Sequence, residues 1–581
     1  MGYITEKLKE WLHDLRLRLA RPDALVLLVG LGLITGLVAG GVIVLFRLLV
    51  EGLGSWLLAG QGEEAFHVLS VEFRFLFPFL SSVLLALMFY RFAKKERVFG
   101  VAHVMERMAY HQGHFSIRGF ILQFLGAAIA LMGGHSVGRE GPHVHLGAAS
   151  GSLFGQAFKL PNNSLRIMAA SGVAAAIAAS FNTPLAGVIF ALEVVMLEYT
   201  LTSFIPIILA AGVATALSNA VIGNLPAFDV PELQMIDLTH LPLVVLLGVI
   251  VGTFAAIFIA MLEKITIHSS KVEIWWRVML AGILVGIIGM FVPDVMGIGY
   301  DTVNATLLGE MTLSALLILV VMKMLATSFC VGLGIPGGMI GPAFFIGATL
   351  GAAMGVVVGI FTGASAEMVG FYAVLGMGAM VAASLQAPLA ALTAIIELTY
   401  NPGIIMPAMI TIVVAQLIAS EVFNKQSLFV SLLKARGQDY KATPIMQSLR
   451  RVGVGSVMYR KFVRTEHVIE PDRARRILEN KAEWIVIDKE GQPLELLPAI
   501  ELAHYIERKE DVESIDLAAI PAKRMQLSPI SLQSNLHQAH EKFTSGDEAL
   551  FVVFNETKGA NNALIYGILT PNMVESVYKL P

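Results

Sequence analysis

The stretch Gly133-Gly-His-Ser-Val-Gly-Arg-Glu-Gly-Pro-His-Val-His-Leu-Gly147 decides the fold, because it places two charges inside long apolar sequence. Charges at membrane depth are costly and usually face a cavity or a pathway, which makes Arg139 and Glu140 functional candidates. The glycines permit broken backbone, and Pro142 suits the first turn of a new helix. A helix that begins near Glu140 points its free N–H groups at the break, so the stretch predicts an anion site. The alternative is a kinked helix with a buried ion pair.

The composition is that of a membrane protein with many spans. Of the 581 residues 56% are hydrophobic and 15% are charged, and the mean hydropathy is +0.72. Such values lie outside the soluble range. Cys330 is the single cysteine, which excludes an internal disulfide. The sequence contains no P-loop, nucleophile elbow or metal-ligand cluster, so we expect no enzyme activity.

The first ninety residues set the expected topology. No cleavable signal peptide is visible, and residues 3–21, within a segment 1–22, predict a basic amphipathic helix lying on the cytoplasmic membrane surface. Ala24–Val50 and Phe75–Tyr90 predict two spans. Basic residues before the first span and after the second indicate that both ends face the cytoplasm. We therefore expect a multi-pass protein of the cell or inner membrane with its N-terminus inside.

Residues 23–440 are expected to form an all-α membrane domain with an internal repeat. Its helices are uneven in length and broken by Gly and Pro, and several are shorter than the roughly 20 residues needed for a span. The spacing Ser180, Pro184, Glu193 recurs as Ser384, Pro388, Glu397.

A second pair of motifs supports the repeat. Gly138-Arg-Glu-Gly-Pro142 has a counterpart in Gly338-Met-Ile-Gly-Pro342. Matching breaks in two halves, about 70–225 and 240–436, predict an inverted-topology repeat in which two helix N-termini meet at a central site.

These motifs resemble the CLC family of chloride channels and chloride/proton antiporters, over about residues 25–440. The resemblance implies a homodimer with a chloride or other small-anion pathway in each subunit, and Glu140 as the gating glutamate. In the family that carboxylate can occupy an anion position and swings away when it is protonated or displaced. A carboxylate at a helix N-terminus mimics an anion, so chloride and Glu140 should compete for the same donors.

The resemblance also implies an anion-binding filter with two departures from the family pattern. Phe99, in Val98-Phe-Gly-Val-Ala102, stands at the family's filter serine, and Phe429 stands at its pathway tyrosine. Without these hydroxyls the site must rely on backbone N–H groups and on the positive edges of aromatic rings. We expect weaker anion binding, and the identity of the anion stays open. The predicted filter residues are Phe99, Gly100, Gly138, Arg139, Gly141, Pro142, Gly338, Met339, Ile340 and Phe429.

A third departure concerns proton coupling. Val194 aligns with the glutamate that hands protons to the cytoplasm in the antiporters, and valine carries no proton. This favours a channel gated by Glu140. The alternatives are a proton-coupled anion antiporter, and a transporter or sensor for another anion regulated through its C-terminal region. Glu193 and its repeat mate Glu397 are interpreted as structural acids that cap neighbouring helices.

The roles of the other polar residues of the membrane domain are less clearly indicated by the sequence. His135, His143 and His145 would add pH sensitivity, and their spacing does not predict a metal site. Lys323 is an isolated intramembrane cation. It either attracts anions to a vestibule or extends to the membrane interface.

Residues 441–581 have a different, charged composition that predicts a small cytoplasmic α/β region in two units, 441–520 and 521–581. The region resembles the paired cystathionine-β-synthase (CBS) domains of many CLC proteins. Gly567-Ile-Leu-Thr-Pro-Asn-Met573 is similar to the nucleotide-contact turn of that module, but Met573 replaces the aspartate that would hold the ribose. We expect a dimerising or regulatory scaffold that requires no cofactor, with adenine-nucleotide binding an open alternative.

Overall fold

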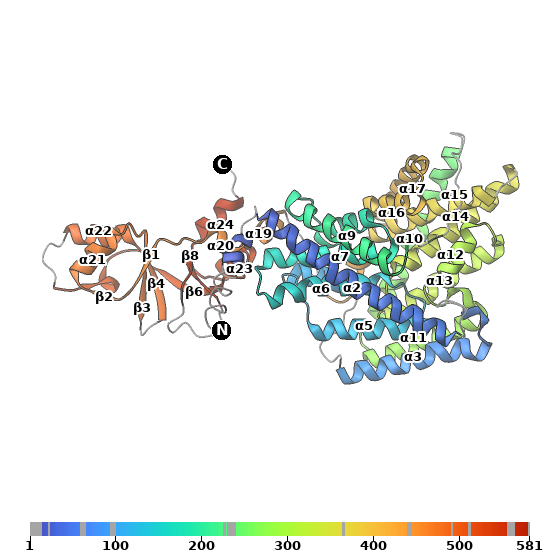
Figure 1. Ribbon diagram of the computed structural model, residues 1–581, viewed down its shortest axis with the longest axis horizontal. Helices are drawn as coiled ribbons and strands as arrows, with labels where there is room; N and C mark the ends of the chain where they lie inside the picture. The colour runs from blue at the N-terminus through green and yellow to red at the C-terminus, as the bar shows by residue number, and fades with distance from the viewer. Residues whose placement is uncertain are drawn as a thin grey trace. The chain divides into compact units, whose positions relative to one another are not determined.

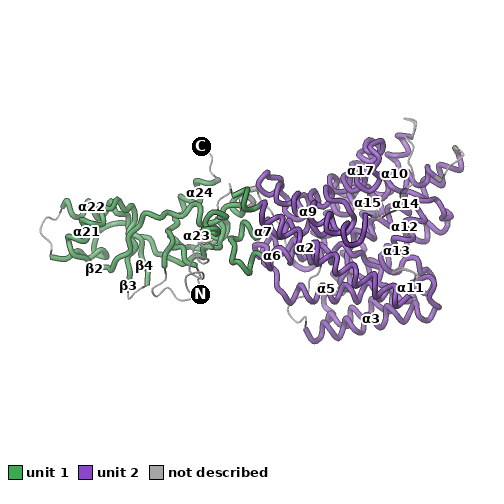
Figure 2. The backbone as a smooth tube through the Cα atoms, in the orientation of Figure 1, with its two compact units in different colours: residues 1–28, 155–165, 442–581 green, residues 29–154, 166–441 purple. Residues whose placement is uncertain are grey.

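The chain forms two compact units in the computed structural model (Figures 1 and 2). One unit comprises residues 1–28, 155–165 and 442–581, and the other comprises residues 29–154 and 166–441. The change in composition near residue 441 therefore falls at a unit boundary. The structure describes residues 14–20, 24–58, 66–92, 100–224, 228, 230, 240–362, 366–438, 444–489, 492–508, 513–554 and 564–578.

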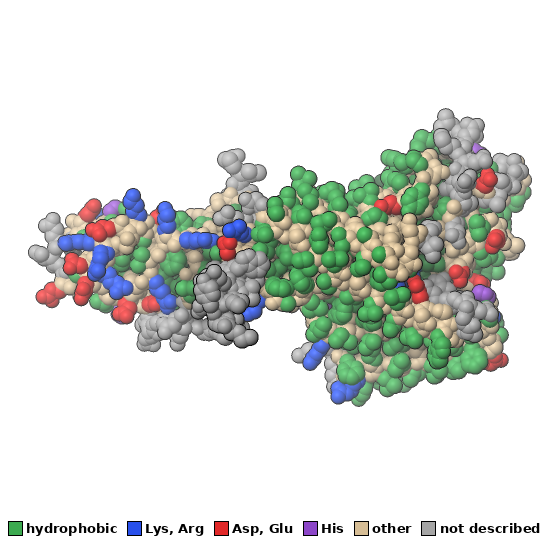
Figure 3. All heavy atoms as spheres, viewed as in Figure 1, with side chains coloured by type: hydrophobic (Ala, Val, Ile, Leu, Met, Phe, Trp, Pro, Cys, Tyr) green, Lys and Arg blue, Asp and Glu red, His purple; other side chains and the backbone are tan. Residues whose placement is uncertain are grey.

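The membrane unit is helical, as the sequence predicts. Among the described residues, 10 helices are long and apolar enough to span a membrane. Hydrophobic side chains cover most of the face of this unit that Figure 3 shows, while charges gather over the other unit. The helices are α2 Leu25–Leu57, α3 Val71–Phe92, α4 Gly100–Tyr110, α5 Ile117–Met132, α6 Glu140–Ala157, α7 Asn162–Phe181, α8 Pro184–Phe190, α9 Leu201–Val221, α10 Leu241–Ser269, α11 Ile274–Phe291, α12 Tyr300–Leu307, α13 Leu313–Leu333, α14 Ile340–Thr362, α15 Ala366–Leu385, α16 Pro388–Thr399, α17 Ile405–Leu417 and α18 Leu428–Ala435.

Small residues allow the central helices to pack closely. A Cβ atom added to Gly147 of α6 would lie 2.1 Å from the carbonyl oxygen of Gly172 in α7. In the second half, a Cβ on Gly347 of α14 would lie 2.3 Å from the carbonyl oxygen of Gly376 in α15. Helices in membranes associate through such close contacts, because lipid supplies no hydrophobic driving force between them. The pairs α6–α7 and α14–α15 thus pack in the same way, through close contacts at glycine residues.

The repeat predicted from sequence has the same local geometry in both copies. Asn182 and Gln386 adopt positive φ angles of 59° and 58° in the turn before each proline. Pro184 and Pro388 then occupy the first turns of α8 and α16, which pack against each other. The all-α, inverted-repeat membrane domain is confirmed.

The second unit contains a six-stranded sheet in the order β1-β3-β4-β6-β7-β8. Each half runs strand, helix, strand, strand, helix, with parallel pairing of β1 to β3 and of β6 to β7. The small C-terminal α/β region with two related parts is therefore present. Its elements are β1 Phe462–Glu466, α21 Pro471–Glu479, β3 Trp484–Lys489, β4 Gln492–Pro498, α22 Ala499–Arg508, β6 Met525–Ser531, α23 Leu536–Thr544, β7 Ala549–Val553, β8 Gly567–Leu569 and α24 Pro571–Tyr578, beside the antiparallel pair β2 Val468–Ile469 and β5 Ile515–Asp516 and the short helices α19 Pro444–Arg451 and α20 Val454–Val457.

The described end of the predicted N-terminal surface helix corrects the expectation that it lies on the membrane. Leu19 is 0% exposed, and Leu17 packs on the apolar cluster around Leu536 and Leu550 in the C-terminal unit. Protein therefore covers apolar side chains that were expected to meet lipid. Residues 1–13, 21 and 22 of this prediction lie outside the described part of the chain.

Candidate anion site

The two Gly-Pro helix breaks, at residues 138–142 and 338–342, lie against each other and are joined by backbone hydrogen bonds. The Gly138 N–H donates to the Gly338 carbonyl at 2.8 Å, and the Gly338 N–H donates to the Gly138 carbonyl at 2.6 Å. A Cβ on Gly141 would lie only 2.6 Å from the Gly338 Cα. This corrects one expectation, because the Gly138 and Gly338 amides bond to each other and are not available to an anion.

We expect Gly141→Ala to break this crossing. The added methyl group has backbone on its far side, so the two breaks must separate. Overpacking of this kind costs about 1–3 kcal/mol, and anion flux in liposomes should be lost. Gly212→Ala in α9 is the matched control, since a Cβ there meets nothing within 4 Å. Normal flux in Gly141→Ala would contradict the assigned contact.

Glu140, at the start of α6, lies where the breaks cross and is 0% exposed. Its Oε2 accepts a hydrogen bond from the Gly341 N–H at 3.0 Å, and its Oε1 accepts one from the hydroxyl group of Tyr300. Gly341 belongs to the first turn of α14, whose dipole favours a negative charge at this end. The carboxylate therefore occupies a position that suits an anion.

Arg139 lies beside this carboxylate and has a different charged partner. Its Nη1 is 3.3 Å from Oε1 of Glu51 in α2, which also contacts Arg47 at 3.0 Å. The Arg139 Cζ lies 5.1 Å from the centre of the Tyr300 ring. The ion pair that the structure shows for Arg139 therefore joins it to Glu51 of α2, next to the site.

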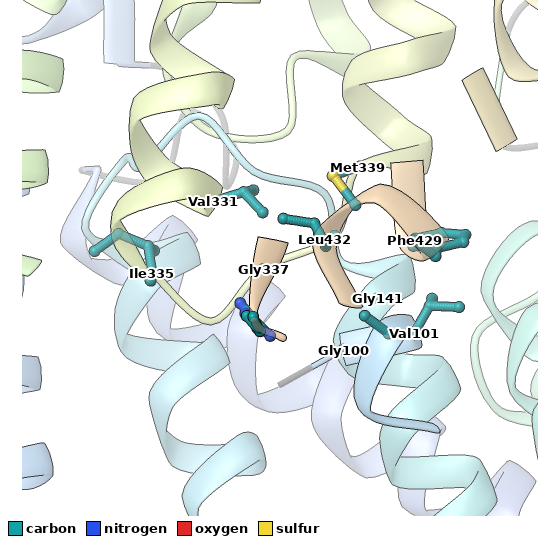
Figure 4. Close-up of a pocket in the computed structure, with 13 residues that line it drawn as sticks. Gly100, Val101, Gly141, Val331, Ile335, Gly337, Met339, Phe429 and Leu432 are labelled. Carbon is teal, nitrogen blue, oxygen red and sulfur yellow. The ribbon is translucent and has the colours of Figure 1, made fainter. Parts of the chain in front are cut away.

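A pocket at the glycine crossing is lined by half of the predicted filter residues (Figure 4). The side chains of Val331 and Ile335 lie on one side of it and that of Phe429 on the other. Arg436, which sequence reasoning missed, also lines it. The lining residues are Gly100, Val101, Ala102, Gly141, Val331, Gly334, Ile335, Gly337, Gly338, Met339, Phe429, Leu432 and Arg436.

Four predicted filter residues need separate mention. Phe99 lies outside the described residues. The Gly100 N–H donates to Oε1 of Gln123 at 3.0 Å, which corrects the expectation that it serves an anion. Pro142 is buried in the first turn of α6, and Ile340 begins α14.

Phe429→Tyr is expected to tighten chloride binding about five- to tenfold, because it adds a hydroxyl donor to a pocket wall that is apolar at this point. Calorimetric titration with chloride measures the change. Phe361→Tyr in α14 serves as the control, since Phe361 is 83% exposed. An unchanged affinity would mean that the Phe429 ring does not point at the anion.

Glu193 and Glu397 cap each other's helices. Glu193 accepts hydrogen bonds from the Leu389 and Ala390 N–H groups at 3.2 and 2.8 Å. Glu397 accepts from the Leu185 and Ala186 N–H groups, both at 2.8 Å. Neither α8 nor α16 has a local side-chain cap, so each carboxylate supplies the missing acceptors across the repeat.

Val194 lies in a π-helical turn, Ala191–Met196, that follows α8. It is 4% exposed and belongs to the apolar core. The neighbouring carboxylate of Glu193 is engaged at the start of α16, so it does not stand in for an acid at position 194 in this structure.

The three histidines of the opening stretch have separate surroundings. His135 Nε2 lies 3.0 Å from Ser81 Oγ and 3.1 Å from Ser82 Oγ. His143 Nδ1 bonds to Ser180 Oγ, and the ring of His145 stacks on that of His103 at 5.2 Å. Across the described residues no group of three potential metal ligands occurs.

Lys323 is 0% exposed, so it does not extend to the membrane interface, which was one of its two predicted roles. Its Nζ donates to the carbonyl groups of Val295, Gly297 and Ile298 at 3.0–3.1 Å. It therefore fixes the loop that leads directly into Tyr300.

Comparison with known proteins agrees with this geometry. The profile described as voltage gated chloride channel matches residues 81–420. The chain belongs to this family, the CLC family. The H+/Cl− exchange transporter ClcA of Vibrio parahaemolyticus is 32% identical over 344 residues, which cover 55% of this chain and 71% of ClcA.

Two solved CLC structures share the fold. A slow cyanobacterial Cl−/H+ antiporter is 25% identical, with a TM-score of 0.60 over 71% of this chain and 97% of that one. A eukaryotic CLC transporter is 19% identical, with a TM-score of 0.60 over 94% of this chain and 97% of that one. The resemblance to CLC proteins is confirmed, and the chain is an integral multi-pass membrane protein of that fold.

Proposed function

We propose that this protein exchanges chloride for protons across a membrane. The observation that carries the proposal is the position of Glu140, a proton-binding group whose carboxylate holds the anion-binding donors at the crossing of two helix starts. The similarity to ClcA and to a Cl−/H+ antiporter favours this alternative over the passive channel that Val194 suggested.

Competition between the carboxylate and chloride supplies the coupling. While Glu140 is ionised it accepts hydrogen bonds from Gly341 and Tyr300, and an anion cannot share those donors. Chloride that takes these donors expels the carboxylate, and an expelled carboxylate in a buried region gains a proton because desolvation disfavours its charge. Chloride thus replaces the Glu140 carboxylate at the Gly341 and Tyr300 donors, and a proton replaces these donors as the partner of the carboxylate.

The proton needs a route from Glu140 to the cytoplasm that does not use residue 194. The Val194 side chain carries no titratable group, and the Glu193 carboxylate is held by the α16 amides. Water in the pocket next to Gly141 is the remaining carrier that we propose.

Coupled flux in liposomes tests the proposal. Purified protein is reconstituted with a chloride gradient and no pH gradient, and external pH and chloride are recorded together. We expect protons to move uphill at a fixed ratio to chloride. Chloride flux that dissipates its gradient without proton movement would contradict exchange and favour the channel.

We further propose a homodimer with both termini in the cytoplasm. The C-terminal region supports the homodimer, because its two strand-helix units resemble paired CBS domains, and we propose that it acts as a dimerising or regulatory scaffold. Cysteine labelling of each terminus in sealed vesicles tests the orientation, and mass measurement in detergent tests the dimer. Adenine-nucleotide binding by this region is a separate proposal, to be tested by titration with ATP.

A further inference from the structure

Tyr300 has a position that the sequence did not reveal. It is the first residue of α12 in the second half of the chain, and its hydroxyl group donates to Glu140 in the first half. The residue is 7% exposed and its ring packs on Phe228 with the ring centres 4.9 Å apart. A buried hydroxyl group therefore points at the position that an anion must take when Glu140 leaves.

The loop before Tyr300 is held firmly. Three carbonyl groups of residues 295–298 accept hydrogen bonds from Lys323, and Gly299 turns the chain with a φ angle of 89°. A Cβ on Gly299 would come within 2.8 Å of the Phe345 ring. Because the loop is fixed, the hydroxyl group has little freedom to follow the Glu140 carboxylate as it moves away.

We propose that the Tyr300 hydroxyl group is a direct ligand of the transported anion, a small monovalent halide such as chloride, at the position that Glu140 vacates. The proposal rests on the proposed function. Loss of the carboxylate removes the acceptor that the Tyr300 O–H and the Gly341 N–H share, and an incoming halide replaces it at both donors. Tyr300 thus supplies a hydroxyl donor beside Glu140, while positions 99 and 429 carry phenylalanine.

Chloride titrations by calorimetry in two backgrounds test this assignment. Tyr300→Phe removes only the hydroxyl group. In the Glu140→Ala background no carboxylate competes, and we expect the added Tyr300→Phe to weaken chloride binding about tenfold, as for loss of one hydrogen bond to a charged group. Tyr372→Phe is the control, because the Tyr372 hydroxyl is also buried but bonds to His240 at 3.0 Å.

The alternative role gives a different result. If Tyr300 only locks the gate, Tyr300→Phe changes chloride affinity when Glu140 is present and leaves it unchanged in Glu140→Ala, and that outcome overturns the proposal. Binding is measured without proton flux, so failure of proton exchange does not mask the answer. Should Tyr300→Phe unfold, 3-fluorotyrosine at position 300 keeps the packing and strengthens the O–H donor. Measured at acidic pH in Glu140→Ala, it should tighten chloride binding, and an unchanged affinity would also overturn the assignment.

Discussion

Glu140→Gln is expected to abolish proton movement while chloride flux continues and loses its dependence on pH. The amide is nearly the same size as the carboxylate but carries no charge and binds no proton in the working range. Its hydrogen bonds to the Gly341 and Tyr300 donors become bonds between neutral groups, worth about 0.5–1.5 kcal/mol each, whereas bonds to the charged carboxylate are worth about 1.5–3 kcal/mol each. The closed state should therefore become about ten- to a hundredfold less favoured.

Parallel recordings of chloride and pH in liposomes measure both effects. Glu310→Gln is the matched control, since Glu310 is exposed in the turn between α12 and α13. Proton movement that survives in Glu140→Gln would remove Glu140 from the coupling mechanism.

Glu397→Ala is expected to destabilise the membrane unit by about 1–3 kcal/mol, because two N–H groups of α8 lose their acceptor. Glu193→Ala should cost about the same, since the repeat places it identically on α16. Thermal unfolding in detergent measures the losses. The double variant shows whether the two losses of stability are additive. They need not be, because α8 and α16 are in contact.

The ratio of protons to chloride separates this capping role from a relay. A structural acid leaves the ratio unchanged in the protein that remains folded. Loss of coupling in Glu193→Ala, with stability preserved, would instead make Glu193 the proton carrier at this end of α8.

The sequence predicted much of the site because its signals are local. Glu140 lies between glycines and a proline in the sequence. The spacing from Pro184 to Glu193 recurs from Pro388 to Glu397, so the repeat can be recognised in this sequence alone. Turn chemistry and helix starts depend on neighbouring residues, so these features can be located without tertiary structure.

The missing part of the site depends on long-range contacts. Tyr300 is 160 positions from Glu140, and no local pattern marks a single tyrosine after a glycine. Glu51 directly follows the predicted span Ala24–Val50, yet α2 extends to Leu57 and brings Glu51 to Arg139. Gly138 and Gly338 were expected to bind an anion, and only the structure shows that they bond to each other.

The linkage between chloride and protons at Glu140 tests the central claim most directly. Chloride is titrated calorimetrically into purified protein in two buffers of different ionisation enthalpy, which gives the number of protons exchanged on binding. We predict net proton uptake with each bound chloride, tighter chloride binding as pH falls, and neither effect in Glu140→Gln. Chloride binding that takes up no proton and does not vary with pH would show that the anion and the Glu140 carboxylate do not compete, which would contradict the proposed exchange.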